Sequence, residues 1–283
     1  MNNILVAGAT GYLGKYITNE LSEQGYYTRV LVRNPEKFKQ YQIPVDGVIH
    51  AQVTDKSSIQ DCCKNIDVVI SSIGITKQKD GLTYMDVDYQ ANLNLLDEVK
   101  RSGVKKFIYV SVLNGEKLRN LKICEAKERF VEELKNSGLE YCIIRPNGFF
   151  SDMVEFYNMA NKGKVYLFGS GEQKANPIHG EDLAKVCVSA IAGKDKEIEV
   201  GGPETLTQTD ITNIAFEVVE RKPKIVHIPD WVRRTILTIG KPIMGSKKFG
   251  PIEFFMNVMA IDMVAPEYGE HTLKNYFNEL RQR

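Results

Sequence analysis

The sequence predicts an α/β protein with a doubly wound parallel sheet and a smaller C-terminal lobe. Three observations predict it: a glycine-rich turn follows the first apolar run, short β-rich runs alternate with amphipathic segments up to residue 146, and the pattern loosens beyond that point. Apolar strands separated by helices are typical of a parallel sheet with right-handed crossovers. The 283 residues, 43% of them hydrophobic, suffice for one large α/β domain with an appended lobe.

The glycine-rich turn contains Gly8, Gly11 and Gly14 between an expected buried strand and an expected helix. A dinucleotide pyrophosphate docks on such a turn, where backbone N–H groups and the positive end of the helix dipole meet. Glycine is required because a Cβ would obstruct the turn, the phosphate or the helix packing. This context favours a Rossmann fold over a glycine-rich surface turn. The expected cofactor contacts of the turn are Gly8, Thr10, Gly11, Tyr12, Leu13 and Gly14.

The remaining elements are expected in order along the chain. Strands are expected at residues 4–7, 28–32, 45–53, 67–71, 106–111, 140–144, 164–168 and 197–200. Helices are expected after the glycine turn and at residues 88–102, 123–135 and 180–192, and residues 57–63 also have helical spacing. The Met-, Phe- and Ile-rich segment 231–263 predicts a partly helical lobe. We therefore expect a dinucleotide-binding core at residues 1–150, with 180–201 added, and a substrate-covering lobe at 151–179 and 202–283.

Composition excludes several function classes. The net charge of +1 argues against a nucleic-acid-binding surface. No run is long and apolar enough to span a bilayer, and the start does not resemble a signal peptide. The five cysteines lack metal-like pairing, and their odd number does not suggest a disulfide framework. We expect a cytoplasmic protein with no metal and a small-molecule substrate; its oligomeric state stays open.

The end of the second expected strand indicates which nicotinamide cofactor is bound. An acidic residue there binds the ribose of NAD, whereas an arginine favours the 2′-phosphate of NADP. This strand ends at Arg33 without an acid, and Lys37 adds a second cation. We therefore expect NADP(H), with NADPH as the working form; a solvated Arg33 is the alternative. Asp55 is expected either at the adenine amino group or in a turn.

Residues that follow other strands complete the expected cofactor site. Ser71, Ser72 and Gly74 end the fourth expected strand and are expected at the ribose and nicotinamide side. The remaining expected cofactor contacts, after the sixth strand, are Pro146, Asn147 and Phe149.

Six segments together resemble the atypical or extended short-chain dehydrogenase/reductase superfamily over nearly the whole chain. These segments are residues 8–14, 88–92, 109–111, 126–127, 145–150 and 177–184. Residues 88–91, 201–203 and 266–269 are similar to the NmrA-like branch that includes divinyl chlorophyllide reductases. The resemblance implies a Rossmann fold and NAD(P)H-dependent oxidoreduction.

The active site that this resemblance implies combines a serine with Tyr-x-x-x-Lys. Ser111 matches the serine and Lys127 the lysine, but Ile123 stands at the tyrosine position. The alternatives are that Ser111 caps the end of its strand and that Lys127 is a solvated charge on its helix. Isoleucine cannot donate a proton, so the usual carbonyl chemistry is in doubt, while ribose binding by Lys127 is unaffected. Divinyl reductases also lack tyrosine at this position, and they reduce an activated carbon–carbon double bond.

Tyr84, in the loop after the fourth expected strand, is the first choice as a substitute proton donor, and an ordinary packed tyrosine is the alternative. The resemblance gives His179 a structural role, with Asp182 either capping the following helix or bracing the site.

The leading hypothesis is an NADPH-dependent reductase of an apolar or conjugated substrate. The alternative is a non-catalytic NADP(H)-binding sensor or assembly protein of the NmrA-like type. A sugar-nucleotide epimerase is a weaker third candidate, because that chemistry needs a base at the sugar hydroxyl.

Overall fold

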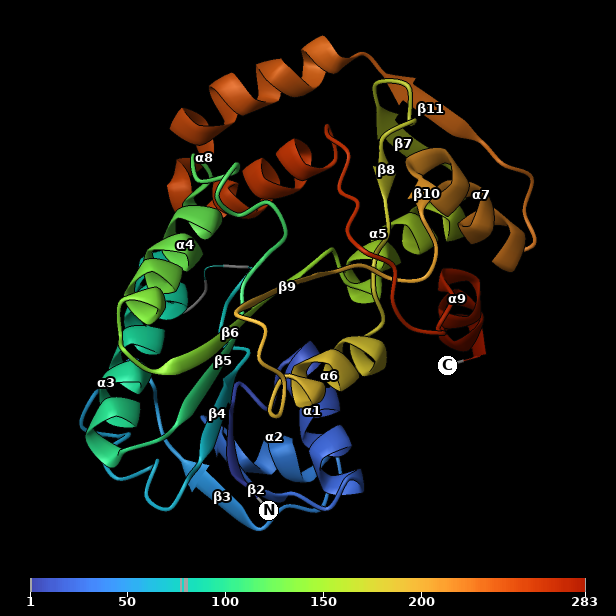
Figure 1. Ribbon diagram of the computed structural model, residues 1–283. Helices are drawn as coiled ribbons and strands as arrows, with labels where there is room; N and C mark the ends of the chain where they lie inside the picture. The colour runs from blue at the N-terminus through green and yellow to red at the C-terminus, as the bar shows by residue number, and fades with distance from the viewer. Residues whose placement is uncertain (1, 77, 79–80, 283) are drawn as a thin grey trace. The chain divides into compact units, whose positions relative to one another are not determined.

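The computed structural model describes residues 2–76, 78 and 81–282 (Figure 1). The chain divides into two compact units. The first unit comprises Met1–Arg145 and Leu183–Ile198, and the second comprises Pro146–Asp182 and Glu199–Arg283.

A seven-stranded sheet with the order β3-β2-β1-β4-β5-β6-β9 organises the first unit. Its first six strands pair in parallel, and the chain winds outward from β1 in both directions. This is the strand order of a dinucleotide-binding α/β fold, so the predicted doubly wound sheet is confirmed. The strands are β1 (Asn3–Ala7), β2 (Tyr27–Val32), β3 (Gly47–His50), β4 (Val68–Ser71), β5 (Lys106–Val110), β6 (Glu140–Pro146) and β9 (Glu197–Val200).

Helices connect these strands (Figure 1). The helices are α1 (Tyr12–Glu23), α2 (Pro35–Lys39), η1 (Met85–Ala91), α3 (Asn92–Ser102), α4 (Lys122–Lys135) and α6 (Gly180–Ser189). The expected helix at residues 88–102 is a π-helical segment, η1, that continues directly into α3. It ends at Gly103, whose φ of 70° is a left-handed conformation that glycine adopts without a Cβ penalty. All five residues of β5 are buried, as expected for a central strand of a parallel sheet.

The helical spacing of residues 57–63 does not produce a helix. Consecutive turns occupy this stretch, with backbone bonds between residues three apart, such as Cys62 N–H to Ile59 O at 3.1 Å. Asp61 and Asn65 have φ values of 61° and 60°. A left-handed residue interrupts the repeating hydrogen-bond ladder, so the apolar side chains reach the core from turns instead.

The second unit packs three helices around a core that includes Phe156, Phe216 and Phe277. Two small sheets accompany them: β7 pairs with β11 in parallel, and β8 pairs with β10 in antiparallel orientation. The elements are α5 (Phe150–Asn161), β7 (Val165–Phe168), β8 (Lys174–Ala175), β10 (Leu206–Thr207), α7 (Gln208–Val218), β11 (Ile225–Ile228), α8 (Asp230–Val258) and α9 (Leu273–Gln282).

The segment expected to be partly helical is α8, which Gly245 interrupts with φ 75° and ψ 152°. Within the described parts of the chain, no helix has the length and apolar character needed to cross a bilayer.

Candidate cofactor site

A cavity of about 290 Å³ lies in the first unit, where β1, β2 and β4 end. Its volume is close to the lower limit of small-molecule sites, roughly 300 Å³. The carboxyl ends of parallel strands are the ligand-binding edge of this fold. Seven of the residues expected at the cofactor line this cavity: Gly8, Thr10, Gly11, Arg33, Lys37, Ser72 and Gly74.

The glycine turn allows α1 to approach the end of β1 very closely. A Cβ on Gly14 would lie 2.1 Å from the carbonyl oxygen of Gly8, and Gly8 has a φ of +92°. Gly11 is the N-cap of α1 and offers no side chain to the N–H groups of the first helical turn. Tyr12 and Leu13 begin that helix, so their backbone belongs to the same turn. The geometry fits an anionic pyrophosphate bound by backbone N–H groups.

Arg33 and Lys37 place positive charge at the cavity beside β2. Arg33 is exposed and has no hydrogen bond or ion pair with any described residue. The Lys37 ammonium donates to the carbonyl oxygen of Thr10 at 3.1 Å. A free guanidinium and a tethered ammonium suit a phosphate monoester bound at this edge.

Asp55 occupies a turn rather than the cavity wall. Its carboxylate accepts from the Ser57 hydroxyl at 2.8 Å and from the Ser57 N–H at 3.0 Å. These bonds lower the pKa of Asp55. Asp55 is not among the described residues that line the cavity, whereas Thr54 is. A role for Asp55 at the adenine therefore stays a prediction.

Ser71 and Ser72, consecutive in the chain, have different surroundings. The Ser71 hydroxyl is buried and donates to the side-chain oxygen of Asn92 at 2.6 Å. Ser72 lines the cavity instead. The structure therefore gives Ser71 a bracing contact to α3 and leaves its predicted contact with the cofactor as a prediction.

Lys127 lies beside the cavity-lining residue Gly74. Its ammonium nitrogen is 3.1 Å from Oδ1 of the fully buried Asp88, which η1 provides. A Cβ on Gly74 would lie 2.6 Å from that Asp88 oxygen and 2.9 Å from the Lys127 nitrogen. Glycine at position 74 therefore lets the ion pair lie directly against the cavity wall.

Burial and pairing act in opposite directions on these two groups. Complete burial raises the pKa of Asp88, and the Lys127 ammonium opposes this shift. Burial alone would lower the pKa of Lys127, but its interactions, the ion pair with Asp88 among them, outweigh burial and hold that pKa above its usual range. Lys127 is therefore positively charged at neutral pH, at a position with only 13% of its side chain exposed.

Tyr109 is the third member of this buried group. Its ring centroid lies 5.5 Å from the Lys127 nitrogen, and its ring packs edge-on against Phe130. Burial raises the pKa of Tyr109, and the nearby Lys127 ammonium opposes this shift. No described group makes a hydrogen bond of acceptable geometry to the Tyr109 hydroxyl. An unpaired buried hydroxyl is uncommon away from functional sites.

The other two predicted catalytic residues are engaged elsewhere. The Ser111 hydroxyl donates to Glu128 at 3.2 Å, and the Tyr84 hydroxyl donates to the carbonyl oxygen of Thr76 at 2.9 Å. Tyr84 is only 2% exposed. These contacts correspond to the packed-tyrosine alternative and do not bring Ser111 or Tyr84 to Lys127, so their catalytic roles stay predictions.

Pro146, Asn147 and Phe149 belong to the second unit. The Asn147 amide donates to the side-chain oxygen of Asn176 at 2.7 Å and to the carbonyl oxygen of Met263 at 2.5 Å. Phe149 is the N-cap of α5. Their predicted contact with the nicotinamide stays a prediction.

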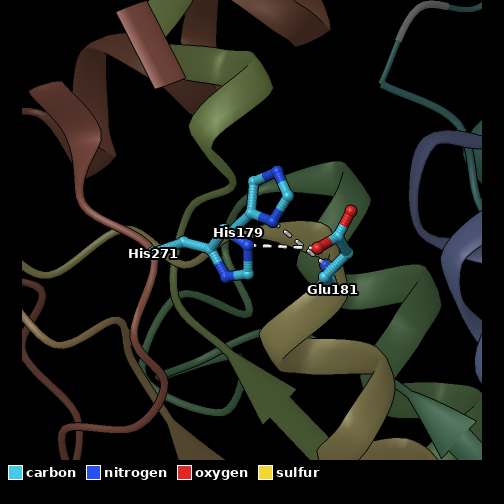
Figure 2. A group of neighbouring side chains, drawn as sticks. All are labelled: His179, Glu181 and His271. Carbon is cyan, nitrogen blue, oxygen red and sulfur yellow. Dashed lines mark hydrogen bonds and ion pairs between the residues drawn. The ribbon is translucent and has the colours of Figure 1, made fainter. Parts of the chain in front are cut away.

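A cluster of His179, Glu181 and His271 lies in the second unit (Figure 2). The imidazole rings of His179 and His271 stack with centroids 4.3 Å apart. His271 Nε2 lies 3.0 Å from Glu181, and its Nδ1 lies 3.0 Å from Asp182. Stacked rings do not direct their nitrogen lone pairs at one point, so we interpret the cluster as a brace between α6 and the segment before α9. The expectation of no metal stays a prediction.

Sequence reasoning did not assign site roles to Asp88 and Tyr109. A signal for Asp88 was present, because it shares a helix face with Ala91 and Leu95, both buried. A carboxylate on an apolar face requires a buried partner. Tyr109 gave no such signal, since a tyrosine in a buried strand is common.

The family comparison agrees with this geometry. A family model described as NAD(P)H-binding matches residues 8–194, about two thirds of the chain. The chain therefore belongs to this NAD(P)H-binding family.

Among curated relatives, the chain is 28% identical to a chloroplastic divinyl chlorophyllide a 8-vinyl-reductase of Arabidopsis thaliana, over 95% of this chain and 72% of the relative. It is 32% identical to the photosystem II assembly factor Ycf39 of Cyanophora paradoxa, over 80% of this chain and 72% of the relative. The NADPH complex of an Escherichia coli NADPH-dependent quinone oxidoreductase has a TM-score of 0.74 with 17% identity, covering 98% of this chain and 99% of the other. That last similarity supports the fold alone.

Proposed function

We propose that the protein is an NADPH-dependent reductase of an apolar or conjugated substrate. The observation that carries the proposal is one cavity that joins a glycine turn, a basic strand end and, behind Gly74, the charged Lys127. The proposal keeps residues 151–179 and 202–283 as the lobe that binds the substrate. A cytoplasmic location stays a prediction.

The chain's own residues bind and orient the cofactor in this proposal. NADPH, when bound, supplies the hydride. The turn at Gly8 and Gly11 holds the pyrophosphate, Arg33 and Lys37 hold the 2′-phosphate, and Lys127 donates to the nicotinamide ribose. Asp88 keeps the Lys127 ammonium in place.

The proposed substrate class rests on the lack of a proton-donating side chain at position 123, where the usual Tyr-x-x-x-Lys pattern has tyrosine. Ile123 is apolar and 6% exposed. A reductase of an activated carbon–carbon double bond can take its proton from water, whereas a carbonyl reductase needs an acid at the oxygen. The similarity to a vinyl reductase supports this choice.

Arg33→Ala tests the cofactor. We expect NADPH to bind at least about tenfold more weakly, because a charge-assisted contact to phosphate is lost, and NADH binding to change little. Isothermal titration with each nucleotide measures both affinities, with Arg129→Ala, a surface substitution on α4, as the control. Equal losses for NADPH and NADH would contradict the NADP assignment.

Turnover separates the reductase from its main alternative. The alternative, an NADP(H)-binding sensor or assembly protein, is favoured by Ile123 and by the similarity to an assembly factor. Purified protein is mixed with NADPH and a panel of electron-poor alkenes and quinones, and loss of NADPH absorbance is followed. Oxidation that Lys127→Met abolishes supports the reductase; tight NADPH binding without turnover of any compound supports the sensor.

A further inference from the structure

Exposed apolar side chains concentrate in one segment of the second unit. Ten large hydrophobic residues among those described are exposed, and seven of them lie between residues 231 and 264. The two most exposed are Ile243 at 76% and Trp231 at 67%. We define the α8 face as Trp231, Ile239 and Ile243. Soluble surfaces rarely gather so many large apolar groups unless they meet a partner.

The α8 face follows from helix geometry. Residues advance about 100° each around an α-helix, so Trp231, Ile239 and Ile243 fall within about one third of its circumference. Gly240, about 180° from Trp231 around the helix, is buried and lies against Phe249. The helix therefore has one side that packs on its own unit and an apolar side that does not.

Positive charge accompanies the α8 face. Residues 230–248 contain five basic residues and one acidic residue, a formal charge of +4 in a chain whose total is +1. Arg234 is 76% exposed and forms an ion pair with Asp230, and Lys247 and Lys248 are exposed just beyond the interruption at Gly245. Apolar side chains with an interfacial tryptophan and flanking cations are the composition of helices that lie in the plane of a membrane surface.

We propose that the α8 face binds the surface of a lipid bilayer that carries anionic headgroups. A bilayer accepts the apolar side chains between its headgroups, and its negative surface potential attracts the cations. A second copy of the chain is disfavoured as the occupant, because it would bring two segments of charge +4 together. This proposal goes beyond the reductase activity and does not depend on it.

Trp231 makes the test direct, because it is the only tryptophan in the chain. The full-length protein is titrated with vesicles of phosphatidylcholine alone or with added phosphatidylglycerol. With the anionic vesicles we expect Trp231 emission to shift to shorter wavelength, brominated acyl chains to quench it, and added salt to weaken both effects. No vesicle binding at low salt, or equal binding to neutral vesicles, overturns the proposal.

Variants identify the surface. Ile239→Ser with Ile243→Ser, and separately Lys247→Glu with Lys248→Glu, are expected to weaken vesicle binding at least about tenfold. Tyr166→Ser removes an exposed aromatic on β7 and is the matched control, with no expected effect. Circular dichroism checks folding, and the salt dependence of the unaltered protein needs no variant. A lipid-free dimer that the Ile239/Ile243 variant dissociates, without vesicle binding by the unaltered protein, assigns the face to self-association and overturns the proposal.

Discussion

Lys127 and Glu128 are neighbours on α4, yet they take part in two very different buried ion pairs. Glu128 accepts from Arg145 at 2.6 and 3.0 Å and from the Ser111 hydroxyl, so its carboxylate is fully hydrogen-bonded. Lys127 instead forms an ion pair with Oδ1 of Asp88. No described group donates a hydrogen bond of acceptable geometry to that oxygen. The Tyr109 hydroxyl beside them is also unpaired among the described residues.

The difference separates a structural pair from a functional one. A buried charge that is fully hydrogen-bonded has no capacity left for a ligand. A buried charge with unsatisfied neighbours at a cavity wall retains that capacity. We therefore expect substitutions at the Glu128 pair to reduce stability, and substitutions at the Lys127 pair to reduce nucleotide binding.

Arg145→Met has the largest expected effect. It leaves the Glu128 carboxylate buried without its partner, which costs about 3–5 kcal/mol of unfolding free energy. Urea denaturation measures the loss, and NADPH affinity of the folded protein should stay within a few-fold of the original. A large loss of affinity with unchanged stability would reverse our assignment of the two pairs.

Lys127→Met should weaken NADPH binding at least about tenfold, because a charge-assisted contact is removed. Its stability loss should be smaller than that of Arg145→Met, because Asp88 can take up a proton. Without Lys127, burial keeps the folded pKa of Asp88 above its ordinary value of 3.8. A carboxyl whose pKa is higher in the folded protein than in the unfolded chain stabilises the folded protein at pH values below its unfolded-state pKa. That stabilisation is lost as the pH rises through its folded-state pKa.

The pH dependence of this variant sharpens the comparison. Urea denaturation of Lys127→Met at a series of pH values should show stability decreasing from acid toward neutral pH. Adding Asp88→Asn should flatten that profile, since no titrating carboxyl remains at the site. A profile that keeps its slope in the double variant would mean that Asp88 is not the group responsible.

Gly74→Ala tests the close approach of the Lys127 pair to the cavity. The added Cβ would lie 2.6 Å from Asp88 Oδ1 and 2.9 Å from the Lys127 nitrogen, so the pair must shift. We expect NADPH affinity to fall several-fold while the fold is retained, as measured by titration and circular dichroism. Gly193→Ala is the matched control, because its Cβ would make only ordinary contacts, the nearest at 3.4 Å.

Glu197→Gln has the smallest expected effect and lies on the structural side of the comparison. Burial would raise the pKa of Glu197, but Lys135 and Arg145 outweigh it and hold the pKa below its ordinary value of 4.5. A carboxyl whose pKa is lower in the folded protein than in the unfolded chain stabilises the folded protein at pH values above its unfolded-state pKa. That stabilisation is lost as the pH falls through its folded-state pKa. Because Glu197 is 36% exposed, we expect the substitution to lower the unfolding free energy by about 1 kcal/mol or less at neutral pH. Denaturation measured at a series of pH values should then show a smaller loss of stability at acid pH than in the original protein.

Local patterns predicted the first unit well because each of its signals is short-range. The glycine turn, the apolar strands and the basic end at Arg33 each lie within a few neighbouring residues, and the sheet order then follows from parallel pairing and right-handed crossovers. Six of the second unit's elements, α5, β8, β10, α7, β11 and α9, were not predicted. The two-residue strands β8 and β10 carry too little periodicity for a pattern to register.

By itself, the sequence determined the doubly wound sheet, the turn at Gly8–Gly14 and the absence of tyrosine at position 123, because these depend on residue type and near spacing. Only the tertiary structure decided that Asp88, 39 positions before Lys127, pairs with it, and that Ser111 turns to Glu128 instead. It also decided that the Asp55 carboxylate caps a turn. A buried charge pairs with whatever partner the packing of distant segments brings within about 3 Å, and no local pattern carries that information.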